Sequence, residues 1–478
     1  MKPRPSLTRR GFATVLIGVA AGLTAFAAAP APVAKPDLPW RVGAASRQIT
    51  PTGPIWLAGY ASRSAPSDGV DSDLFAKALA LDDTQGGRVV LVTLDLIRVP
   101  KALRDFVETE AATRFGLKPA ELLLNSSHTH SGPELEPDRM VLETVFSRMA
   151  KPADIAALHA YQEFLRRSIL EVIGASLQAA APAKLDYSHG RAGFAMNRRR
   201  PEAKGAISNN PYPDGPVDHD VPVLKVTGPD GKVRALLFGY ACHNTTLGGT
   251  KVSGDYAGHA QQYLESSYPG AVALYVQGCA GDQNPYPRGK VAPGQADEES
   301  ARQHGRALAN AVHTALAARL RPITGPLKTA LGSALLDYDP PTPAELAKFT
   351  GPAFTPPVLE RARTLAQRLQ RGEKLAPLAC PVQVLHFGTA LTLVAIGGEV
   401  TVDYSLRLKR ELQGEGAVWV AGYSNNVFGY LGSRRVIEEG GYEGGGANTR
   451  ILNHPGNLAR DTEDRVVAKV HELVRGGR

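Results

Sequence analysis

Cysteine is scarce in this chain, and the three cysteines that occur show no paired spacing. The 478-residue sequence holds only Cys242, Cys279 and Cys380. An odd count without a Cys-x-x-Cys pair supports neither a disulfide framework nor a cysteine zinc site. We therefore expect Cys242 and Cys279 to be small buried apolar residues.

A strong excess of one charge is also missing. The formal net charge is +8 at pH 7, and four of the basic residues lie in a leader that we expect to be removed, which leaves 8 − 4 = +4. These four are Lys2, Arg4, Arg9 and Arg10. So small an excess gives no reason to expect a nucleic-acid partner. With 43% hydrophobic and 21% charged residues, the chain has enough apolar material for one large or two fused globular domains.

Long hydrophobic runs are confined to the beginning of the chain. The first thirty residues combine a basic start, an apolar run over 12–26 and small residues over 25–29, which is typical of a cleaved export signal. Thr8-Arg9-Arg10-Gly11-Phe12 adds the twin-arginine signature. A membrane anchor is the alternative, but the run is short and rich in Ala and Gly.

We therefore expect a twin-arginine export signal over residues 1–29 and an Ala/Pro linker over 30–39. The mature protein would be periplasmic or secreted, with no stable membrane span.

The remaining chain alternates apolar strands with amphipathic helices. Residues 88–97 form a predicted buried strand, 101–115 a helix, and the next apolar run begins at Leu122. Such a strand-helix-strand unit is long enough for a parallel crossover. We predict an α/β fold with mixed, largely parallel central sheets and flanking helices, in a single large catalytic domain over 40–478. Further helices are expected over 153–178, from 256, over 298–320, 358–371, 399–412 and 460–475, and further strands over 218–226, 233–240, 271–276, 382–387, 390–396 and 417–421.

Polar clusters stand where the predicted strands end. The run that begins at Leu122 ends in Ser126-Ser127-His128-Thr129-His130-Ser131-Gly132-Pro133. Strand side chains alternate, so His128 and His130 should point the same way. Other strands lead to His243, to Asp282 with Asn284, to Glu399, and to the 423–430 segment. Each cluster alone fits a loop histidine, a helix cap or a packed tyrosine, but one shared pocket explains all of them.

Two histidines and a carboxylate around an open position are the usual ligands of a hydrolytic zinc site. Bound Zn²⁺ lowers the pKa of water from ~16 to about 7, so hydroxide becomes available at neutral pH. The sequence therefore favours zinc-activated water attacking a carbonyl.

Several motifs, in this order, resemble those of the neutral, non-lysosomal ceramidase family, from about residue 41 to 474. They are His128-Thr129-His130-Ser131-Gly132-Pro133, Asn197-Arg198, Tyr240-Ala241-Cys242-His243-Asn244-Thr245-Thr246, Gly254-Asp255-Tyr256-Ala257-Gly258, Gly397-Gly398-Glu399-Val400-Thr401, Gly422-Tyr423-Ser424-Asn425 through Tyr430, and Tyr442-Glu443-Gly444.

The resemblance implies a zinc ion held by His128, His243, Glu399 and Tyr430. It places three further side chains, those of His130, Arg198 and Tyr442, around the substrate carbonyl. His130 would also pass a proton to the leaving amine, and Arg198 would stabilise the oxyanion.

Two departures from the family limit what the resemblance implies. Asn284 stands where the family has a serine, so we expect it to position substrate or water rather than act as a nucleophile. The family's C-terminal β-sandwich is also expected to be absent. Hydrolysis of a linear amide, from an N-acyl amide to a ceramide-like N-acylsphingosine, is thus a firmer expectation than ceramide itself.

Two other functions fit the same pocket: a zinc esterase or lactonase, and a non-catalytic binder of lipid or carbohydrate. The expected partner is a small-molecule or lipid amide, and no protein partner can be inferred. Asp255 and Asp282 are expected to be cap and loop carboxylates. The basic run 198–200 is expected in an exposed loop.

Overall fold

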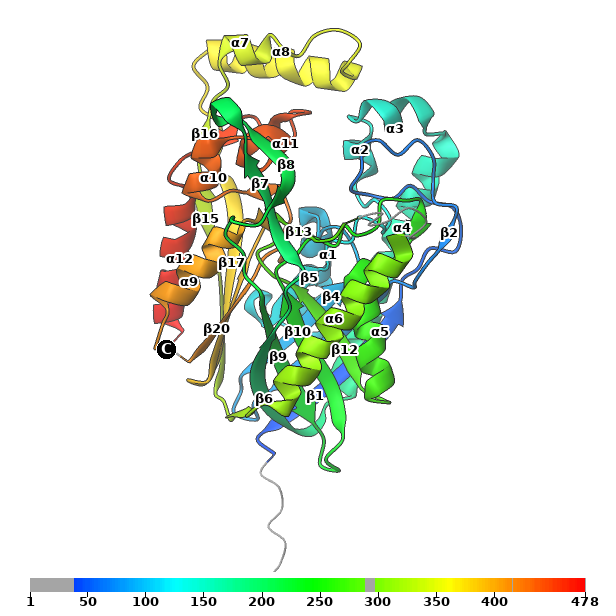
Figure 1. Ribbon diagram of the computed structural model, residues 1–478, viewed down its shortest axis with the longest axis vertical. Helices are drawn as coiled ribbons and strands as arrows, with labels where there is room; N and C mark the ends of the chain where they lie inside the picture. The colour runs from blue at the N-terminus through cyan, green and yellow to red at the C-terminus, as the bar shows by residue number, and fades with distance from the viewer. Residues whose placement is uncertain (1–37, 289–296, 415, 478) are drawn as a thin grey trace, which may run out of the picture. The chain divides into compact units, whose positions relative to one another are not determined.

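The computed structural model describes residues 38–288, 297–414 and 416–477, and the expected export signal lies outside these ranges. The described chain forms two main β-sheets packed face to face, with helices on both outer faces, and several small sheets of two or three strands (Figure 1). This arrangement of layers places the ends of several strands near one another, and those ends carry the site.

Nine strands form the first sheet, in the order β12-β10-β9-β6-β1-β3-β4-β5, with β14 beside β6. The pairs at its two ends, β4–β5 and β10–β12, are parallel, and the pairs between them are antiparallel. The strands are β1 (Trp40–Gln48), β3 (Phe75–Asp82), β4 (Arg88–Leu94), β5 (Leu122–Ser126), β6 (Ala181–Arg191), β9 (Asp220–Thr227), β10 (Val233–Tyr240), β12 (Val272–Gln277) and β14 (Arg321–Ile323).

The second sheet has the order β15-β17-β18-β20, and its last pair is parallel. Its strands are β15 (Leu327–Leu336), β17 (Leu378–Phe387), β18 (Leu391–Ile396) and β20 (Ala417–Ala421). Leu91, Leu123 and Leu237 of the first sheet share one buried cluster with Leu393 and Trp419 of the second. Burial of these facing side chains removes apolar surface from water and holds the two layers together.

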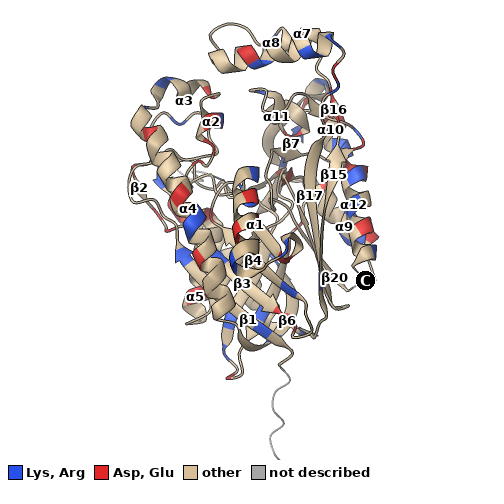
Figure 2. Ribbon diagram, turned by 180° about the vertical axis from the view of Figure 1, so that it is seen from behind, with Lys and Arg blue, Asp and Glu red and all other residues tan. Residues whose placement is uncertain are grey.

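Helices cover both outer faces of the paired sheets. The first sheet is covered by α1 (Lys101–Phe115), α4 (Pro152–Gln178), α5 (Asp255–Ser267) and α6 (Asp297–Ala317), and the second by α9 (Val402–Glu411) and α12 (Thr462–Gly476). Along α4, Leu158, Leu165, Ile169 and Val172 recur at helical spacing and are buried against the sheet. The charged positions of α4, α9 and α12 are spread along their lengths, whereas the strands behind them carry few (Figure 2).

Shorter elements complete the described chain. The strands are β2 (Gly69–Val70), β7 (Ala195–Pro201), β8 (Ile207–Tyr212), β11 (Lys251–Val252), β13 (Gln283–Pro285), β16 (Tyr338–Asp339), β19 (Glu399–Val400), β21 (Tyr430–Leu431) and β22 (Asn457–Leu458). The helices are α2 (Pro137–Met140), α3 (Thr144–Met149), α7 (Pro343–Leu346), α8 (Pro356–Gln370), α10 (Arg434–Glu439) and α11 (Ala447–Thr449), with single turns at Pro119–Glu121, Ala203–Gly205 and Tyr442–Gly446. Within the described ranges, no helix combines the length and the apolar character needed to cross a membrane.

The predicted α/β class with mixed sheets and flanking helices is confirmed, but the expectation of largely parallel sheets was wrong. Short turns over 83–87, 228–232 and 388–390 join consecutive strands as hairpins, and a hairpin makes its strands antiparallel. The strand-helix-strand units that the sequence predicted form the parallel pairs at the ends of the sheets.

The two edges of the first sheet meet through the side chain of Asn125, at the end of β5. Its Oδ1 accepts from the backbone N–H of Gln277 at 2.8 Å, which ties β5 to β12. Its Nδ2 donates to the carbonyl of Gly422 at 2.8 Å and to Ser424 Oγ at 3.1 Å, in the segment after β20. One buried amide therefore joins three of the segments that carry the site.

Candidate active site

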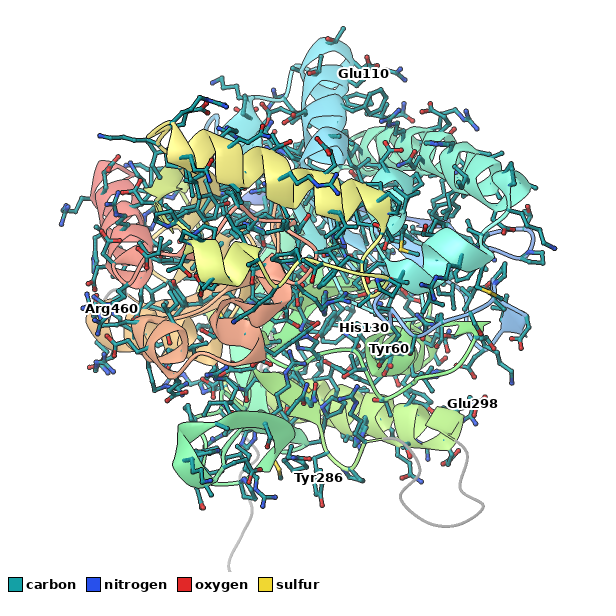
Figure 3. The ribbon with its side chains drawn as sticks, turned by 90° about the horizontal axis from the view of Figure 1, so that it is seen from above. Tyr60, Glu110, His130, Tyr286, Glu298 and Arg460 are labelled. Atoms are coloured by element: carbon teal, nitrogen blue, oxygen red, sulfur yellow. The ribbon has the colours of Figure 1, made fainter. Side chains whose placement is uncertain are left out.

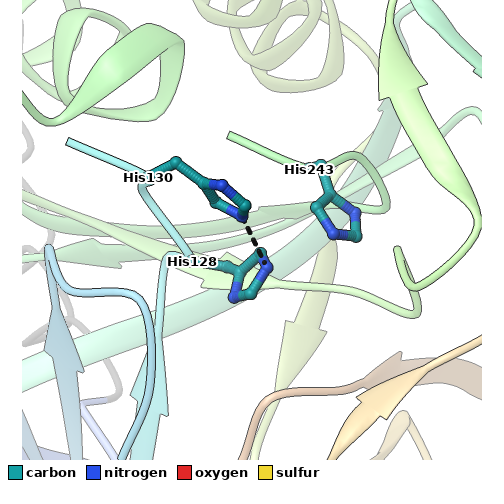
Figure 4. A group of neighbouring side chains, drawn as sticks. All are labelled: His128, His130 and His243. Atoms are coloured by element: carbon teal, nitrogen blue, oxygen red, sulfur yellow. Dashed lines mark hydrogen bonds between the residues drawn. The ribbon is translucent and has the colours of Figure 1, made fainter. Parts of the chain in front are cut away.

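The segments that follow β5 and β10 run side by side. Thr129 and Asn244 form an isolated parallel bridge there, and the backbone N–H of His130 donates to the Asn244 carbonyl at 3.2 Å. His128 turns the chain at the end of β5 with a φ of 62°, in the left-handed region that non-glycine residues seldom adopt. His128 and His243 are consequently brought into one buried space from strands that are not neighbours in the sheet (Figure 4).

Backbone carbonyls fix the orientation of two imidazole rings. His128 Nδ1 lies 2.7 Å from the Ile97 carbonyl, and His243 Nδ1 lies 2.6 Å from the Ala280 carbonyl. A carbonyl only accepts, so each Nδ1 must carry the proton, and each Nε2 then has a free lone pair. This is the usual way in which a protein prepares histidines to bind a metal ion.

Glu399 and Tyr430 face each other across the β19–β21 pair and reach the same space. Glu399 Oε2 lies 3.3 Å from His128 Nε2 and 3.6 Å from His243 Nε2, and this buried oxygen has no hydrogen-bond partner among the described residues. The Tyr430 hydroxyl lies 3.5 Å from His243 Nε2. The backbone of Tyr430 is fixed on both sides by Asn448, which accepts from its N–H and donates to its carbonyl at 2.9 Å.

These separations fit a tetrahedral metal site. Bonds of 2.0 to 2.1 Å to a central ion place neighbouring ligand atoms about 3.3 to 3.4 Å apart. The contacts of 3.3, 3.6 and 3.5 Å among His128, His243, Glu399 and Tyr430 are close to that spacing. The structure also groups His128, His130 and His243, whose ligand nitrogens all lie within 4.8 Å of one another. His130 can therefore serve either as a ligand or as a neighbour of the ion.

The protonation states also suit a cation. Burial and the charge of Arg198 lower the pKa of His243 to about 3, so this imidazole is neutral. Burial alone would raise the pKa of the Glu399 carboxyl, but His128 and His243 hold that pKa well below its usual range. Neutral imidazoles and an ionised carboxylate are the forms that bind a metal ion.

His130 lies beside this set with its Nε2 3.1 Å from His128 Nε2. Burial, together with His128 and His243, lowers the pKa of His130 well below its ordinary value. Its ring packs on Tyr60, with the two centroids 4.8 Å apart (Figure 3). A Cβ at Gly59, whose φ is +96°, would collide with the His130 ring, so the ring can occupy this place only beside glycine.

Arg198 is buried and engages three polar partners. Its Nε donates to Glu443 Oε1 at 2.7 Å, its Nη2 to the Tyr430 hydroxyl at 2.8 Å and its Nη1 to Asn284 Oδ1 at 3.2 Å. Glu443 also receives Arg199 Nη1 at 2.8 Å. The expectation of an exposed basic loop was therefore wrong for Arg198 and Arg199, because β7 carries both inward against one buried carboxylate.

The other predicted residues lie around this centre. Asn284, on β13, also receives the Thr245 hydroxyl at 3.3 Å. Tyr442 packs edge-on against Tyr430, with the two ring centroids 5.4 Å apart, and is 46% exposed. Asp282 accepts from the backbone N–H of Val402 at 2.9 Å, at the start of α9. Asp255 opens α5 and accepts from the backbone N–H of Leu247 at 2.9 Å.

A cavity of about 370 Å³ lies at this centre, and His128, His130, Glu399, Tyr430 and Tyr442 are among the residues that line it. Four supporting residues received no role from the sequence: Tyr60, Asn125, Glu443 and Asn448. The sequence signals for Asn125 and Glu443 are their positions: Asn125 directly follows an apolar run, and Glu443 is a charged residue in a glycine-rich stretch.

The chain shares its family and its fold with known proteins. A family model described as neutral/alkaline non-lysosomal ceramidase, N-terminal, matches residues 40–327. Neutral ceramidase B of Dictyostelium discoideum is 26% identical over 278 residues, which cover 53% of this chain and 36% of that protein. The match thus spans little more than a third of that relative's length.

Two solved structures share the fold. The neutral ceramidase of Pseudomonas aeruginosa superposes with a TM-score of 0.69 at 21% identity, covering 91% of this chain and 75% of the other. A ceramidase complexed with C2 gives a TM-score of 0.68 at 20% identity, covering 91% and 76%.

Proposed function

Because the chain belongs to the neutral/alkaline non-lysosomal ceramidase family, we propose that it is a zinc-dependent hydrolase of a linear N-acyl amide, with a ceramide-like lipid amide as the reference substrate. The observation that carries the zinc is the set of His128, His243 and Glu399. The Nε2 atoms of two imidazoles converge on one carboxylate oxygen, which has no hydrogen-bond partner among the residues that the structure describes.

Zn²⁺, when bound, supplies Lewis acidity that polarises a carbonyl and makes water nucleophilic near neutral pH. His128, His243, Glu399 and Tyr430 would hold the ion. Two imidazoles, a carboxylate and a phenol oxygen are all donors that Zn²⁺ accepts.

The remaining side chains prepare the substrate for attack. His130 is neutral, lies beside the metal set and faces the cavity, so it can accept a proton from the attacking water and pass that proton to the leaving amine. Arg198 donates to the Tyr430 hydroxyl and so adds positive charge next to the carbonyl oxygen that gains charge during attack. Tyr442, at the mouth of the cavity, offers a hydroxyl to the same oxygen.

Asn284 stands where the family has a serine, and it cannot act as a nucleophile. Its carboxamide accepts from Arg198 and Thr245 and has no nucleophilic oxygen. A covalent acyl-enzyme at this position is therefore not part of the proposal, and Asn284 positions substrate or water. Attack by water serves esters as well as amides, so matched amide and ester substrates belong in the test.

The test combines metal analysis with hydrolysis. Purified protein should hold about one zinc per chain and cleave N-acyl amides, and His243→Ala and Glu399→Ala should each lose zinc and activity together. His159→Ala, which removes an exposed histidine from α4, is the matched control and should retain both. Full zinc content in both site variants would show that the metal is held elsewhere or not at all.

A further inference from the structure

The cavity beside the histidines carries an excess of positive charge. Its charged lining residues are the arginines 63, 98, 139 and 450 and the glutamates 134, 143 and 399. Once Glu399 is assigned to the metal site, four guanidinium groups share the cavity with two carboxylates. Plain ceramide, which has no ionised group, would leave this excess uncompensated.

Local ion pairs account for only part of the excess. Arg450 pairs with Glu143 at 2.5 Å, and Arg98 pairs with Glu136, outside the cavity lining, at 3.2 Å. Arg139, on the one-turn helix α2, forms no ion pair and no side-chain hydrogen bond with any residue that the structure describes. It is thus a cation in a cavity wall without a partner.

Three buried N–H donors in this wall have no acceptor within the described part of the chain. They are Trp56 Nε1, Arg98 Nε and Arg139 Nε, and each belongs to a residue that lines the cavity. Buried N–H groups are almost always paired, so an unpaired group needs an explanation such as a ligand or an ordered water. Three donors without acceptors around one cavity predict a ligand rich in acceptor oxygens.

The electrostatics of Arg139 agree with this. Burial and the like charge of Arg98 lower the pKa of Arg139, while Glu134, Glu136 and Glu143 act in the opposite direction. Glu134 is itself buried and already accepts the backbone N–H groups of Leu135 and Glu136 at 2.9 and 3.0 Å. An anion bound at Arg139 would offset the cost of keeping this charge out of water.

This wall lies close to the metal set. The Ile97 carbonyl holds His128 Nδ1 at 2.7 Å, and Arg98 is the next residue in the chain. Glu399 contributes to the electrostatic environment of Arg98 as well. A group bound at Arg98 and Arg139 would therefore be separated from the scissile amide by a short spacer.

We infer that Arg139, together with Arg98 and Trp56, binds an anionic group of the substrate, so that the amide cleaved by this chain carries a carboxylate, sulfonate or phosphate near the scissile bond. The inference rests on the proposed amide hydrolysis and specifies its substrate class. It sets this chain apart from hydrolases of wholly neutral lipid amides.

The test compares amides that differ only in charge. N-octanoylglycine and N-octanoylglycinamide place the difference on the amine side, and N-octylsuccinamic acid and N-octylsuccinamide place it on the acyl side. N-octanoyltaurine replaces the carboxylate by a sulfonate. For at least one pair, kcat/KM should favour the anion by about tenfold to a hundredfold, the range for a hydrogen bond to a charged group.

Variants connect this preference to the wall. Arg139→Gln should reduce the anion-to-neutral ratio of kcat/KM toward one, and Arg139→Lys should retain part of it because the charge remains without the planar fork. Arg167→Gln removes the same charge from an exposed position on α4 and should leave the ratio unchanged. A ratio near one in the wild type, or an unchanged ratio in Arg139→Gln, would overturn the inference while amide hydrolysis stands.

Equilibrium binding separates the two proposals. If no amide is hydrolysed, the proposed function fails, and isothermal titration of N-octanoylglycine and N-octanoylglycinamide into the full chain still tests the anion site. The glycine compound should bind at least tenfold more tightly than the glycinamide to the wild type, and Arg139→Gln should remove that difference. Equal affinity of the two compounds for the wild type would refute the anion site independently of catalysis.

Discussion

The Nε2 atoms of His128 and His130 lie 3.1 Å apart. Of these two rings, only His128 has its Nδ1 bound to a backbone carbonyl. The Nδ1 of His128 donates to the Ile97 carbonyl, so the Nε2 of His128 carries no proton and a proton shared in the 3.1 Å contact belongs to His130. The Nδ1 of His130 is buried without a partner in the described chain. His130 is therefore less constrained in its protonation than either of its neighbours.

This difference predicts that His128 binds the metal ion and that His130 transfers protons. His130→Ala should retain zinc at the wild-type level and lose about 10² to 10⁴ in kcat/KM, the contribution of a positioned acid or base. Metal analysis and kinetics on the same preparation check both parts. Zinc loss as severe as in His243→Ala would instead make His130 a ligand.

Gly59 makes room for the His130 ring, and its substitution should disturb the site specifically. Gly59→Ala places a methyl group against the ring at a φ of +96°, so we expect reduced kcat and a lower Tm with zinc retained. Gly53→Ala is the control, because a Cβ there meets nothing within 4 Å. Equal effects of the two substitutions on kcat would contradict the steric explanation.

Asn284 and Arg198 should differ in importance. Asn284→Ala should lose about tenfold to a thousandfold in rate, as expected for one hydrogen-bonding group, with zinc unchanged. Arg198→Ala should lose more, mainly in kcat, because it removes the charge that contacts Tyr430. An inactive Asn284→Ala beside a nearly normal Arg198→Ala would reverse this assignment and require a different substrate orientation.

His454 should make stability depend on pH. Its Nε2 donates to the Phe428 carbonyl at 2.9 Å and its Nδ1 accepts from the Tyr338 hydroxyl at 2.8 Å, and burial lowers its pKa below the ordinary 6.5. As the pH falls below that value, the unfolded chain takes up a proton first, so this stabilisation is complete above pH 6.5 and is lost on acidification. The slope is at most about 1.4 kcal/mol per pH unit for one proton.

Urea unfolding between about pH 5 and pH 7.5 measures this slope. His454→Gln should flatten it relative to the wild type. His304, whose pKa burial also lowers, is present in both proteins, so the difference reports on His454. Parallel curves for the two proteins would assign the acid sensitivity to other groups.

Export through the twin-arginine route remains a proposal based on the sequence. Arg9→Lys combined with Arg10→Lys should leave the precursor in the cytoplasm, because a receptor reads the arginine pair. Cell fractionation of wild-type and variant precursors measures the outcome. Unchanged periplasmic delivery would favour the general secretion route.

Segments with strong local patterns could be predicted from the sequence. The predicted ranges 101–115, 233–240 and 417–421 coincide with α1, β10 and β20, because continuous apolar periodicity defines them. The predicted strand 88–97 ends early, at Leu94, because the next residue, Asp95, uses its carboxylate to accept the backbone N–H of Phe75.

Relationships across long sequence distances could not be predicted in the same way. Arg198 meets Glu443 245 positions further along the chain, and Asn125 meets Gln277 across 152 positions. No local periodicity encodes either pair. The Asn125–Gln277 bond depends on the two edges of the first sheet meeting, which the expected parallel crossovers did not contain, and the Arg198–Glu443 pair depends on β7 packing against the turn after α10.

The left-handed backbone at His128 puts folding and chemistry in competition. Glycine or asparagine would adopt a φ of 62° with less strain than histidine, yet neither has an imidazole. For glycine, the backbone strain would be lower by about 1 to 2 kcal/mol. Laboratory evolution for heat tolerance alone would favour replacing this histidine, whereas evolution for turnover would retain it. The residue at position 128 would then reveal which of the two pressures a lineage had experienced.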